Sequence, residues 1–411
     1  MDIFQIFAIL ITLTAVFAYF NYKVIKLPTT IGLMLISFIL SLGLILLGNI
    51  WSGLKDPATA LIANIDFNET LMRGMLSYLL FAGALHVNLN DLRDQKFIVG
   101  FLATVGVLIS TFLFGTAAYY IFQIIGIQIN YIYCLVFGAL VSPTDPIAVM
   151  GILKRINVPK SLETKIAGES LFNDGIGVVI FIVLFEIAFG GHEVSAGHVI
   201  ELFALEAVGG AAFGLATGYI AYRMLKTVDN YSVEAMITLA LVTGSYALAM
   251  TLHLSGPIAV VVSGLLIGNR GRSFAMSDKT RENLDTFWEL IDEILNAVLF
   301  VLIGMEVLVL SFGWDYILAG LIAIPTLLLT RAFAVSLANL VLKWRREFSK
   351  GMIRILVWGG LRGGISVALA LSLPQSEERA VILTATYIIV AFSILVQGLT
   401  IKKLVESIYG D

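Results

Sequence analysis

Residues 137–181 read FGALVSPTDPIAVMGILKRINVPKSLETKIAGESLFNDGIGVVIF. Two apolar segments are joined here by a basic loop, and both carry acidic side chains: Asp145 in the first, Glu169 and Asp174 in the second. An ionised carboxylate at the centre of a membrane helix costs roughly 2.5–3.5 kcal/mol on insertion scales. Such residues usually belong to ion or proton pathways, so we expect the functional site in this stretch.

The loop lysines indicate how deep the two aspartates lie, because lysine side chains stay near the lipid headgroups. Asp145 precedes Lys154 by nine residues, and Asp174 follows Lys165 by nine. At about 1.5 Å per helical residue, both lie roughly 13 Å deep, near the middle of a hydrocarbon layer of about 30 Å. We therefore expect the two carboxylates to face one site.

Pro143 and Pro146 flank Asp145 and predict a break in the first helix at Ser142–Pro146, because proline removes a backbone donor and clashes with the preceding turn. Freed backbone groups are tolerated in a membrane where they line a cavity or are buried in protein. Discontinuous helices of this kind form the ion sites of many secondary transporters. A simple proline kink with a structural acid pair is the alternative.

The second segment offers oxygen ligands. Ser170 and Asp174 are four residues apart and share a helix face, with Glu169 and Asn173 on the adjacent face. Together with the Thr144 carbonyl from the break, these are hard ligands suited to a small hard cation. Neither cysteine nor histidine lies beside them, which argues against zinc or another soft-metal site.

Four motifs in order cover most of the chain: Thr144-Asp145-Pro146, Gly168-Glu169-Ser170-Leu171-Phe172-Asn173-Asp174-Gly175, Leu329-Thr330-Arg331 and Trp358-Gly359-Gly360-Leu361-Arg362-Gly363-Gly364. They resemble the motifs of the NhaP/NHE-type sodium/proton antiporters, the first family of monovalent cation:proton antiporters. The resemblance implies a secondary active antiporter with Na⁺ and H⁺ as substrates, no cofactor, and a homodimeric state in the cell membrane. In that family an Asn-Asp pair accompanies electroneutral exchange, so Asn173 implies one cation exchanged for one proton.

Composition places the chain among all-α polytopic membrane proteins. It is 59% hydrophobic and 13% charged, whereas a soluble domain has about 25% charged residues. We expect a single transmembrane domain over residues 1–411, embedded in the lipid bilayer. The net charge of −3 gives no indication of a nucleic-acid partner. One cysteine, Cys134, excludes an internal disulfide, and Asn21-Tyr22-Lys23 lacks a small-residue cleavage site, so the first helix should be uncleaved.

Hydrophobic segments predict about 13 transmembrane helices. Their approximate limits are Ile3–Phe20, Thr30–Ile50, Leu71–Leu89, Phe97–Ile125, Tyr131–Leu153, Ile166–Phe189, Val199–Leu225, Val233–Leu252, Ser255–Gly268, Leu290–Phe312, Ile317–Leu342, Met352–Leu373 and Arg379–Val405.

Most of the basic residues fall on alternate connections, and by the positive-inside rule that side is cytoplasmic. The opposite side holds only Lys55, Arg73 and Arg379. The C-terminus is therefore expected inside and, with an odd number of spans, the N-terminus outside. The cytoplasmic clusters are Lys23 and Lys26; Arg93 and Lys96; Lys154, Arg155, Lys160 and Lys165; Arg223 and Lys226; Arg270, Arg272, Lys279 and Arg281; Lys343, Arg345, Arg346, Lys350 and Arg354; and Lys402 and Lys403.

Two arginines lie within spans. Arg362 follows Arg354 by eight residues, which places it roughly 12 Å deep. A buried guanidinium needs a carboxylate partner, and Glu169 is the one we expect. Arg331, twelve residues before Lys343, lies at a similar depth; it either compensates charge at the broken helix ends or takes part in transport.

Spans five and twelve are the candidates for discontinuous crossing helices. Span twelve comes seven spans after span five, so the two run in opposite directions, as inverted repeats require. We expect spans 1–6 and 8–13 to form the repeats, with span 7 linking them. The resemblance implies a core bundle of spans 4–6 and 11–13 and a dimer-interface part of spans 1–3 and 7–10. The glycines Gly210, Gly214 and Gly218 on span seven allow close helix packing, which we expect within one subunit.

The expected mechanism is competition for a carboxylate. Desolvation favours the protonated form of Asp174, which can hold a proton or a Na⁺ but not both. Asp145 couples to it, and Ser170 and the Thr144 carbonyl complete the oxygen shell. Rocking of one helix bundle against the other exposes the site to each side in turn. The sequence has no phosphate-binding Gly-Lys-Ser/Thr motif, as expected of a secondary transporter.

Two alternatives stay open. Oxygen ligands alone do not distinguish Na⁺ from K⁺ or Li⁺, so a K⁺/H⁺ or Li⁺/H⁺ antiporter fits the same site. An intramembrane aspartyl protease would also need two aspartates in the membrane. Such enzymes usually show Gly-x-Gly-Asp at one acid, and Phe172-Asn173-Asp174-Gly175 does not match that pattern.

Overall fold

The computed structural model describes residues 3–48, 67–156, 158–189, 196–272, 276–310, 313–345, 348 and 351–409. All regular secondary structure in these residues is helical, apart from one isolated antiparallel bridge between Asp145 and Leu361. The predicted all-α class is therefore confirmed.

The helices of the first half follow the predicted segments closely. In the labels used here, η denotes a short π- or 3-10-helical turn. They are α1 (Ile3–Phe20), η1 (Asn21–Ile25), α2 (Thr29–Gly48), α4 (Phe67–Glu69), η2 (Thr70–Met75), α5 (Leu76–His86), α6 (Leu89–Asp94), α7 (Lys96–Phe101), η3 (Leu102–Gly106), α8 (Val107–Ile125), α9 (Tyr131–Val141), α10 (Ile147–Ile156) and α11 (Lys160–Phe189).

The second half continues in the same way, with several helices joined end to end through π-turns. Its elements are α12 (Ala196–Ala204), η4 (Leu205–Gly209), α13 (Gly210–Leu225), α14 (Tyr231–Thr251), α15 (Gly256–Leu266), η5 (Ile267–Gly271), α17 (Asp278–Glu306), η6 (Val307–Val309), α18 (Trp314–Leu342), η7 (Lys343–Arg345), α19 (Met352–Trp358), α20 (Gly364–Leu371), α21 (Glu377–Phe392), η8 (Ser393–Gln397) and α22 (Gly398–Tyr409).

Eight of the described helices are long and apolar enough to cross a membrane when a helix and its π-turns are counted together. The other predicted spans coincide with helices that are interrupted or shorter, or with α17, whose N-terminal half carries many charges. A multi-pass membrane protein is therefore confirmed, and the count of 13 spans stays a prediction.

Two segments are interrupted in mid-course. Helix α9 ends at Val141 and α10 begins at Ile147, so the break falls where the two prolines predict it. Helix α19 ends at Trp358 and α20 begins at Gly364, so the glycine-rich residues between them are not helical. The two breaks meet, because the Asp145 amide donates to the Leu361 carbonyl at 2.9 Å.

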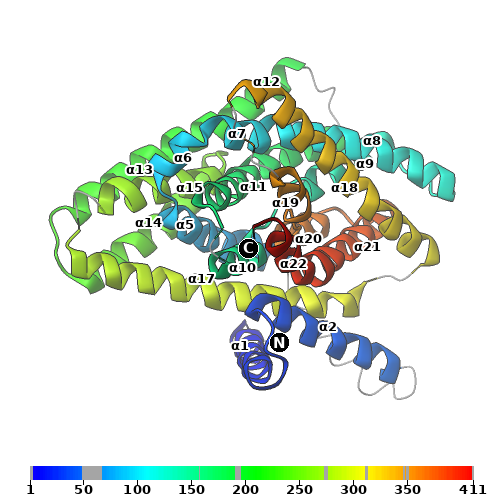
Figure 1. Cartoon of the computed structure of the whole chain (residues 1–411), viewed down its shortest axis with the longest axis horizontal. Coiled ribbons are helices and arrows are strands. Elements are labelled where there is room, and N and C mark those ends of the chain that lie inside the picture. Colours follow the sequence, from blue (N-terminus) through cyan, green and yellow to red (C-terminus); the bar gives the residue numbers. More distant parts are fainter. Residues whose placement is uncertain are drawn as a thin grey trace.

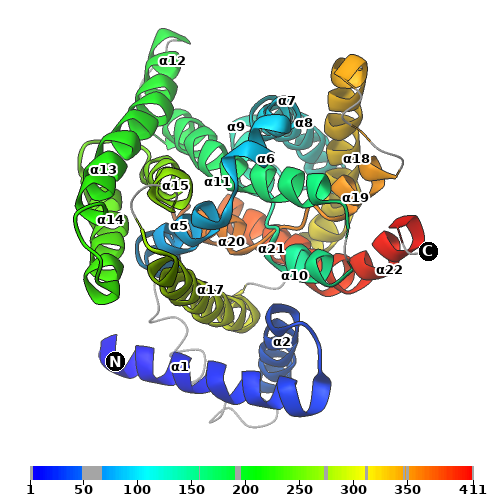
Figure 2. The same cartoon turned by 60° about the vertical axis from the view of Figure 1, so that its left-hand side comes forward.

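The breaks lie in the interior of the helix assembly. In Figure 1, α10, α11, α19 and α20 lie near the centre, the long α17 runs along one side, and α2 packs against it. The turned view places α11 and α20 between α13 and α14 on one flank and α18 on the other (Figure 2). The meeting point of the two breaks is thus surrounded by helices.

Close packing of α13 on α15 accounts for the glycine repeat. A Cβ on Gly214 would lie 2.3 Å from the Ala259 carbonyl oxygen, and Gly210 would place one 2.8 Å from the Ser255 carbonyl oxygen. Because no larger residue fits, the glycines let the two backbones touch. The predicted contact within one subunit is confirmed.

Candidate functional site

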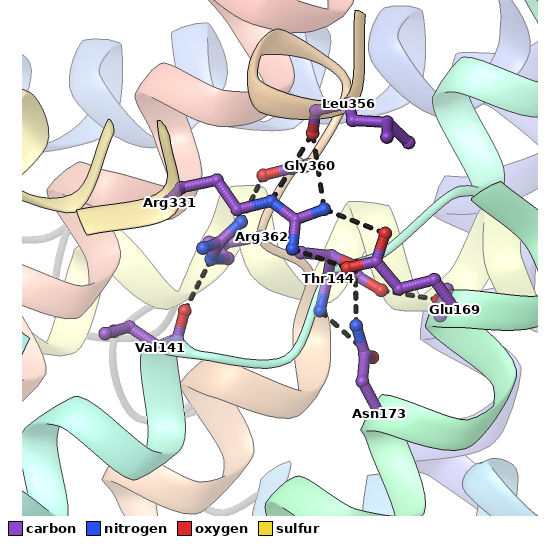
Figure 3. Close-up of polar contacts among 9 residues, drawn as sticks. Val141, Thr144, Glu169, Asn173, Arg331, Leu356, Gly360 and Arg362 are labelled. Atoms are coloured by element: carbon purple, nitrogen blue, oxygen red, sulfur yellow. Dashed lines mark hydrogen bonds and ion pairs between the residues drawn. The ribbon is translucent and has the colours of Figure 1, made fainter. Parts of the chain in front are cut away.

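Two side chains from α11 form hydrogen bonds to the non-helical backbone of the first break. The Ser170 hydroxyl donates to the Thr144 carbonyl at 2.5 Å. Asn173 uses both amide atoms on Thr144: its Oδ1 accepts from the Thr144 amide at 3.2 Å, and its Nδ2 donates to the Thr144 hydroxyl at 2.8 Å (Figure 3). Backbone groups that leave a helix must find new partners when buried, and Thr144 finds them on the neighbouring helix.

Asp145 is fixed by backbone on both sides. Its amide donates to Leu361 in the second break, and its Oδ1 accepts from the Ile147 amide, the first residue of α10, at 2.9 Å. The other carboxylate oxygen lies directly over Gly363, where an added Cβ would come within 2.0 Å of Oδ2. The position of this acid therefore depends on both interrupted segments.

A cavity of about 1050 Å³ brings the predicted site residues together. Thr144, Asp145, Ser170 and Asp174 all line it, so the two aspartates face one space, as their estimated depths predict. Among the described residues, none donates a hydrogen bond to the Asp174 carboxylate. Its oxygens are therefore available to a cation or a proton from the cavity.

One face of α11 lines the cavity from its mouth to Asp174. Glu163, Ala167 and Ser170 lie on this face. The mouth is polar and charged, and Lys160 there pairs with Asp91 at 2.7 Å. An open path lined by polar residues thus reaches a carboxylate in the middle of the helices. Other polar residues at the mouth are Asn88, Asn90, Asn269, Arg270, Arg272, Glu289, Asp292 and Glu293.

The expected ion pair between Glu169 and Arg362 is wrong, because Arg331 takes that place. Both terminal nitrogens of Arg331 bond the two Glu169 oxygens, with Nη2 to Oε2 at 2.9 Å (Figure 3). Only 6% of the Arg331 side chain and 2% of the Glu169 side chain are exposed. Both arginines lie at a similar depth, and spacing along the chain gives depth without saying which arginine faces α11.

Arg362 instead bonds backbone carbonyls in both breaks. Its Nε donates to the Val141 carbonyl at the end of α9, and its Nη1 donates to the Gly360 carbonyl (Figure 3). The C-terminal end of a helix carries partial negative charge, which a guanidinium offsets. Charge compensation at a broken helix, proposed from the sequence for Arg331, thus falls mainly to Arg362, although Arg331 also donates to the Leu356 carbonyl at 3.3 and 3.4 Å.

Asn173 differs from its expected place among the cation ligands. It is fully buried, it is not part of the cavity wall, and its amide is occupied by Thr144. Asn173 therefore holds the break in shape from behind, while Ser170 and the Thr144 carbonyl lie on the cavity side.

A family model described as "Sodium/hydrogen exchanger, transmembrane" matches residues 10–407, which is almost the whole chain. The chain belongs to this sodium/hydrogen exchanger family. The predicted resemblance is therefore confirmed.

Several members of the exchanger family are similar over nearly full length. The chain is 53% identical over 410 residues to the Na(+)/H(+) antiporter NhaP of Pseudomonas aeruginosa, covering 98% of this chain and 96% of that protein. It is 35% identical to the Na(+)/H(+) antiporter NhaH of Halobacillus dabanensis, covering 94% and 93%. The solved sodium proton antiporter MjNhaP1 of Methanocaldococcus jannaschii matches with a TM-score of 0.79 over both whole chains, at 18% identity, which shows the shared fold.

These relatives are antiporters rather than enzymes, which leaves the protease alternative without support. Sequence reasoning missed two contacts at the site: the pairing of Arg331 with Glu169, and a bond from Gln397 to the carbonyl of Trp358. A glutamine in an otherwise apolar span is a signal that could have directed attention to the second, since a buried amide needs partners.

Proposed function

We propose that this chain is a secondary active, electroneutral antiporter that exchanges one Na⁺ for one proton at Asp174 and Asp145. The observation that carries the proposal is the position of the two carboxylates on one cavity, at the meeting point of two interrupted helices. The Ser170 hydroxyl and the Thr144 carbonyl add neutral oxygens on the same wall, and such hard ligands suit an alkali cation.

Competition for Asp174 couples the two ions. A carboxylate taken out of bulk water favours a bound proton, and a Na⁺ at the same oxygens displaces it. With Na⁺ bound, the cation offsets the charge of the ionised Asp174 carboxylate, and with a proton bound that carboxylate is neutral; Asp145 keeps the same protonation state in both cases. The net charge carried across the membrane is therefore the same in both directions. The Glu169–Arg331 pair is also neutral overall, and Asn173 adds no charge.

Access to the site alternates between the two sides of the membrane. The cavity mouth is formed by connections whose basic residues mark the cytoplasmic side, including Lys160, Arg270 and Arg272. We therefore assign this conformation to the inward-open state. Rocking of the bundle that contains the two breaks closes the mouth and opens the other side.

The wider architecture follows from the same proposal. It comprises 13 spans, with the C-terminus in the cytoplasm, the N-terminus outside and the protein in the cell membrane as a homodimer. Spans 1–6 and 8–13 form inverted repeats joined by span 7, and spans five and twelve cross at their breaks. The core bundle consists of spans 4–6 and 11–13, and spans 1–3 and 7–10 form the part that carries the dimer interface.

The test replaces Asp174 with asparagine, which keeps the shape of the side chain and removes its charge. Purified protein is reconstituted into liposomes, and Na⁺-dependent collapse of a pH gradient is followed with a fluorescent dye. Asp174→Asn is expected to abolish the exchange, while the control Asp278→Asn, at a carboxylate that is 98% exposed, retains it. Exchange at the wild-type rate in Asp174→Asn would show that the carboxylate is misassigned.

The same assay identifies which cation is transported. Na⁺, K⁺ and Li⁺ are added in turn at equal concentration, because carboxylate and carbonyl oxygens can bind all three. We expect Na⁺ to drive the largest proton flux. A larger response to K⁺ would make the chain a K⁺/H⁺ antiporter with the same site.

A further inference from the structure

The last long helix of the chain contains a π-turn opposite the second break. Helix α21 passes through η8 into α22 without leaving the helical path, and the π-turn covers Ser393–Gln397. Single π-turns within α-helices often occur at functional sites, because the extra residue redirects side chains. Here both Ser393 and Gln397 are 2% exposed, so the π-turn presents two polar side chains to the protein interior.

Gln397 is bonded at both ends of its amide. Its Oε1 accepts from the Ser393 hydroxyl at 2.9 Å, and its Nε2 donates to the Trp358 carbonyl at 2.8 Å. Trp358 is the last residue of α19, so its carbonyl has no helical partner once the chain unwinds at Gly359. Gln397 supplies the donor that the interrupted helix lacks.

Only a few residues along the chain separate the Trp358 carbonyl from the proposed cation site. Three residues after Trp358, the Leu361 carbonyl accepts the amide of Asp145, and two residues further Gly363 lies against the Asp145 carboxylate. Gln397 and Ser393 also line a small cavity of about 10 Å³, and Arg331, Gly360 and Arg362 form part of the same wall. The π-turn thus contacts the same unwound segment that fixes Asp145.

We propose that Gln397 is a positioning residue for the cation site: it anchors the end of α19, and through the unwound segment it sets the position of Asp145. The inference rests on the proposed function for its transport readout. Ser393 acts one step further away, by orienting the amide of Gln397. The helix that ends the described chain thereby contributes to the site without touching the cation.

Trp358 offers a matched control, because its side chain bonds the same continuous helix one turn further on. Its indole Nε1 donates to the Thr400 hydroxyl at 2.9 Å, so this bond joins α19 to α22, whereas the Gln397 bond joins α19 to η8. Thr400→Val removes that bond and leaves the backbone carbonyl bonded to Gln397. A merely structural tether between the two helices would make both substitutions equivalent.

The experiment compares Gln397→Met, Ser393→Ala and Thr400→Val in reconstituted protein, with folded amounts equalised by size-exclusion chromatography. Loss of one hydrogen bond that fixes the segment is expected to raise the KM for Na⁺ roughly three- to tenfold in Gln397→Met, with Vmax little changed. Ser393→Ala should show a smaller rise, and Thr400→Val none. Equal KM values in Gln397→Met and wild type would overturn the proposal.

Hydrogen–deuterium exchange gives a readout that does not depend on transport. In Gln397→Met, deuterium uptake should rise in peptides that cover residues 356–364 and also in those that cover 141–150, because the Asp145 amide donates to Leu361. A rise in the first region alone would show that Gln397 does not act on Asp145. If the wild-type protein exchanged no cation, the proposed function would fail, and the uptake data would still decide the role of Gln397.

Discussion

Thr144 makes three of the hydrogen bonds that fix the first break. Its carbonyl, amide and hydroxyl are each bonded to α11, and that carbonyl lies beside the hydroxyl of Ser170 on the cavity side. Two neighbouring residues, Asn173 and Asp174, have different roles in this arrangement. Asn173 holds the backbone of Thr144 in shape, and Asp174, next to it on the chain, lines the cavity, where the proposed function needs it.

Glu169 belongs to the supporting structure, and its removal tests that assignment. Glu169→Ala leaves the Arg331 guanidinium buried without its carboxylate, and breaking a buried pair in this way costs about 3–5 kcal/mol. We expect a lower yield of folded protein and a lower melting temperature in detergent, with an unchanged KM for Na⁺ in the fraction that folds. The control is Glu406→Ala, which breaks an exposed pair with Lys402 at 3.7 Å and should cost little. Normal stability with an altered KM would move Glu169 into the cation site.

The residue scale also shows what the sequence could and could not provide. Depth followed from spacing to the loop lysines, and it correctly grouped Asp145 with Asp174 on one cavity. The same estimate placed Arg331 and Arg362 at nearly equal depth, and it could not tell which of them faces Glu169. That choice depends on the rotation of α18 relative to α11, which only tertiary packing determines.

At the scale of elements, the site is a junction of two interrupted helices. Several backbone carbonyls there have a partner from the other break or from a neighbouring element: Arg362 donates to Val141, Arg331 to Leu356 and Gln397 to Trp358. Unpaired groups at this depth would be costly, since no lipid group can bond them. The partners therefore stabilise a conformation that the isolated segments would not adopt.

Gly363 is one of the residues at which the two breaks are in contact. In Gly363→Ala, the new Cβ would lie 2.0 Å from Oδ2 of Asp145, so the carboxylate or the segment has to move. We expect the KM for Na⁺ to rise by more than about tenfold, because the change displaces a group that faces the cation. The control is Gly244→Ala on α14, where nothing lies within 4 Å, and where alanine favours a helix by up to about 1 kcal/mol. An unchanged KM in Gly363→Ala would mean that Asp145 is not held by this contact.

Element breaks were partly predictable. Pro143 and Pro146 predicted the first break because proline cannot continue a helix, and the glycines around Arg362 indicated the second. The π-turn at Ser393–Gln397 has no such signal, since its sequence SILVQ contains neither proline nor glycine; only its two polar residues, Ser393 and Gln397, distinguish it from its surroundings. Its position depends on the contact with Trp358, which lies 39 residues away along the chain.

At the scale of the whole molecule, the proposed inward-open state exposes the cavity on the side of Lys160, Arg270 and Arg272, which line it. This predicts side-specific labelling of the cavity. In a Cys134→Ala background, Ala167→Cys places a thiol on the cavity wall between the mouth and Asp174. A membrane-impermeant thiol reagent should modify it and block exchange in everted vesicles, which expose the cytoplasmic side, and Na⁺ should slow the reaction.

The matching control for orientation is Gln375→Cys, in the exposed connection between α20 and α21 on the predicted outer side. It should react only in vesicles of the native orientation. Modification of both positions from the same side would contradict the proposed topology or the inward-open assignment.

Competition between a proton and Na⁺ for Asp174 is tested most directly by the pH dependence of the KM in proteoliposomes. Isotopic Na⁺ uptake is measured over a range of concentrations at several equal internal and external pH values. If the two ions occupy the carboxylate by turns, the KM should rise by up to about tenfold for each unit of acidification, with Vmax unchanged at saturating Na⁺. A KM that stays constant while Vmax falls with acidification would show that proton and cation bind at separate places, and it would contradict the mechanism.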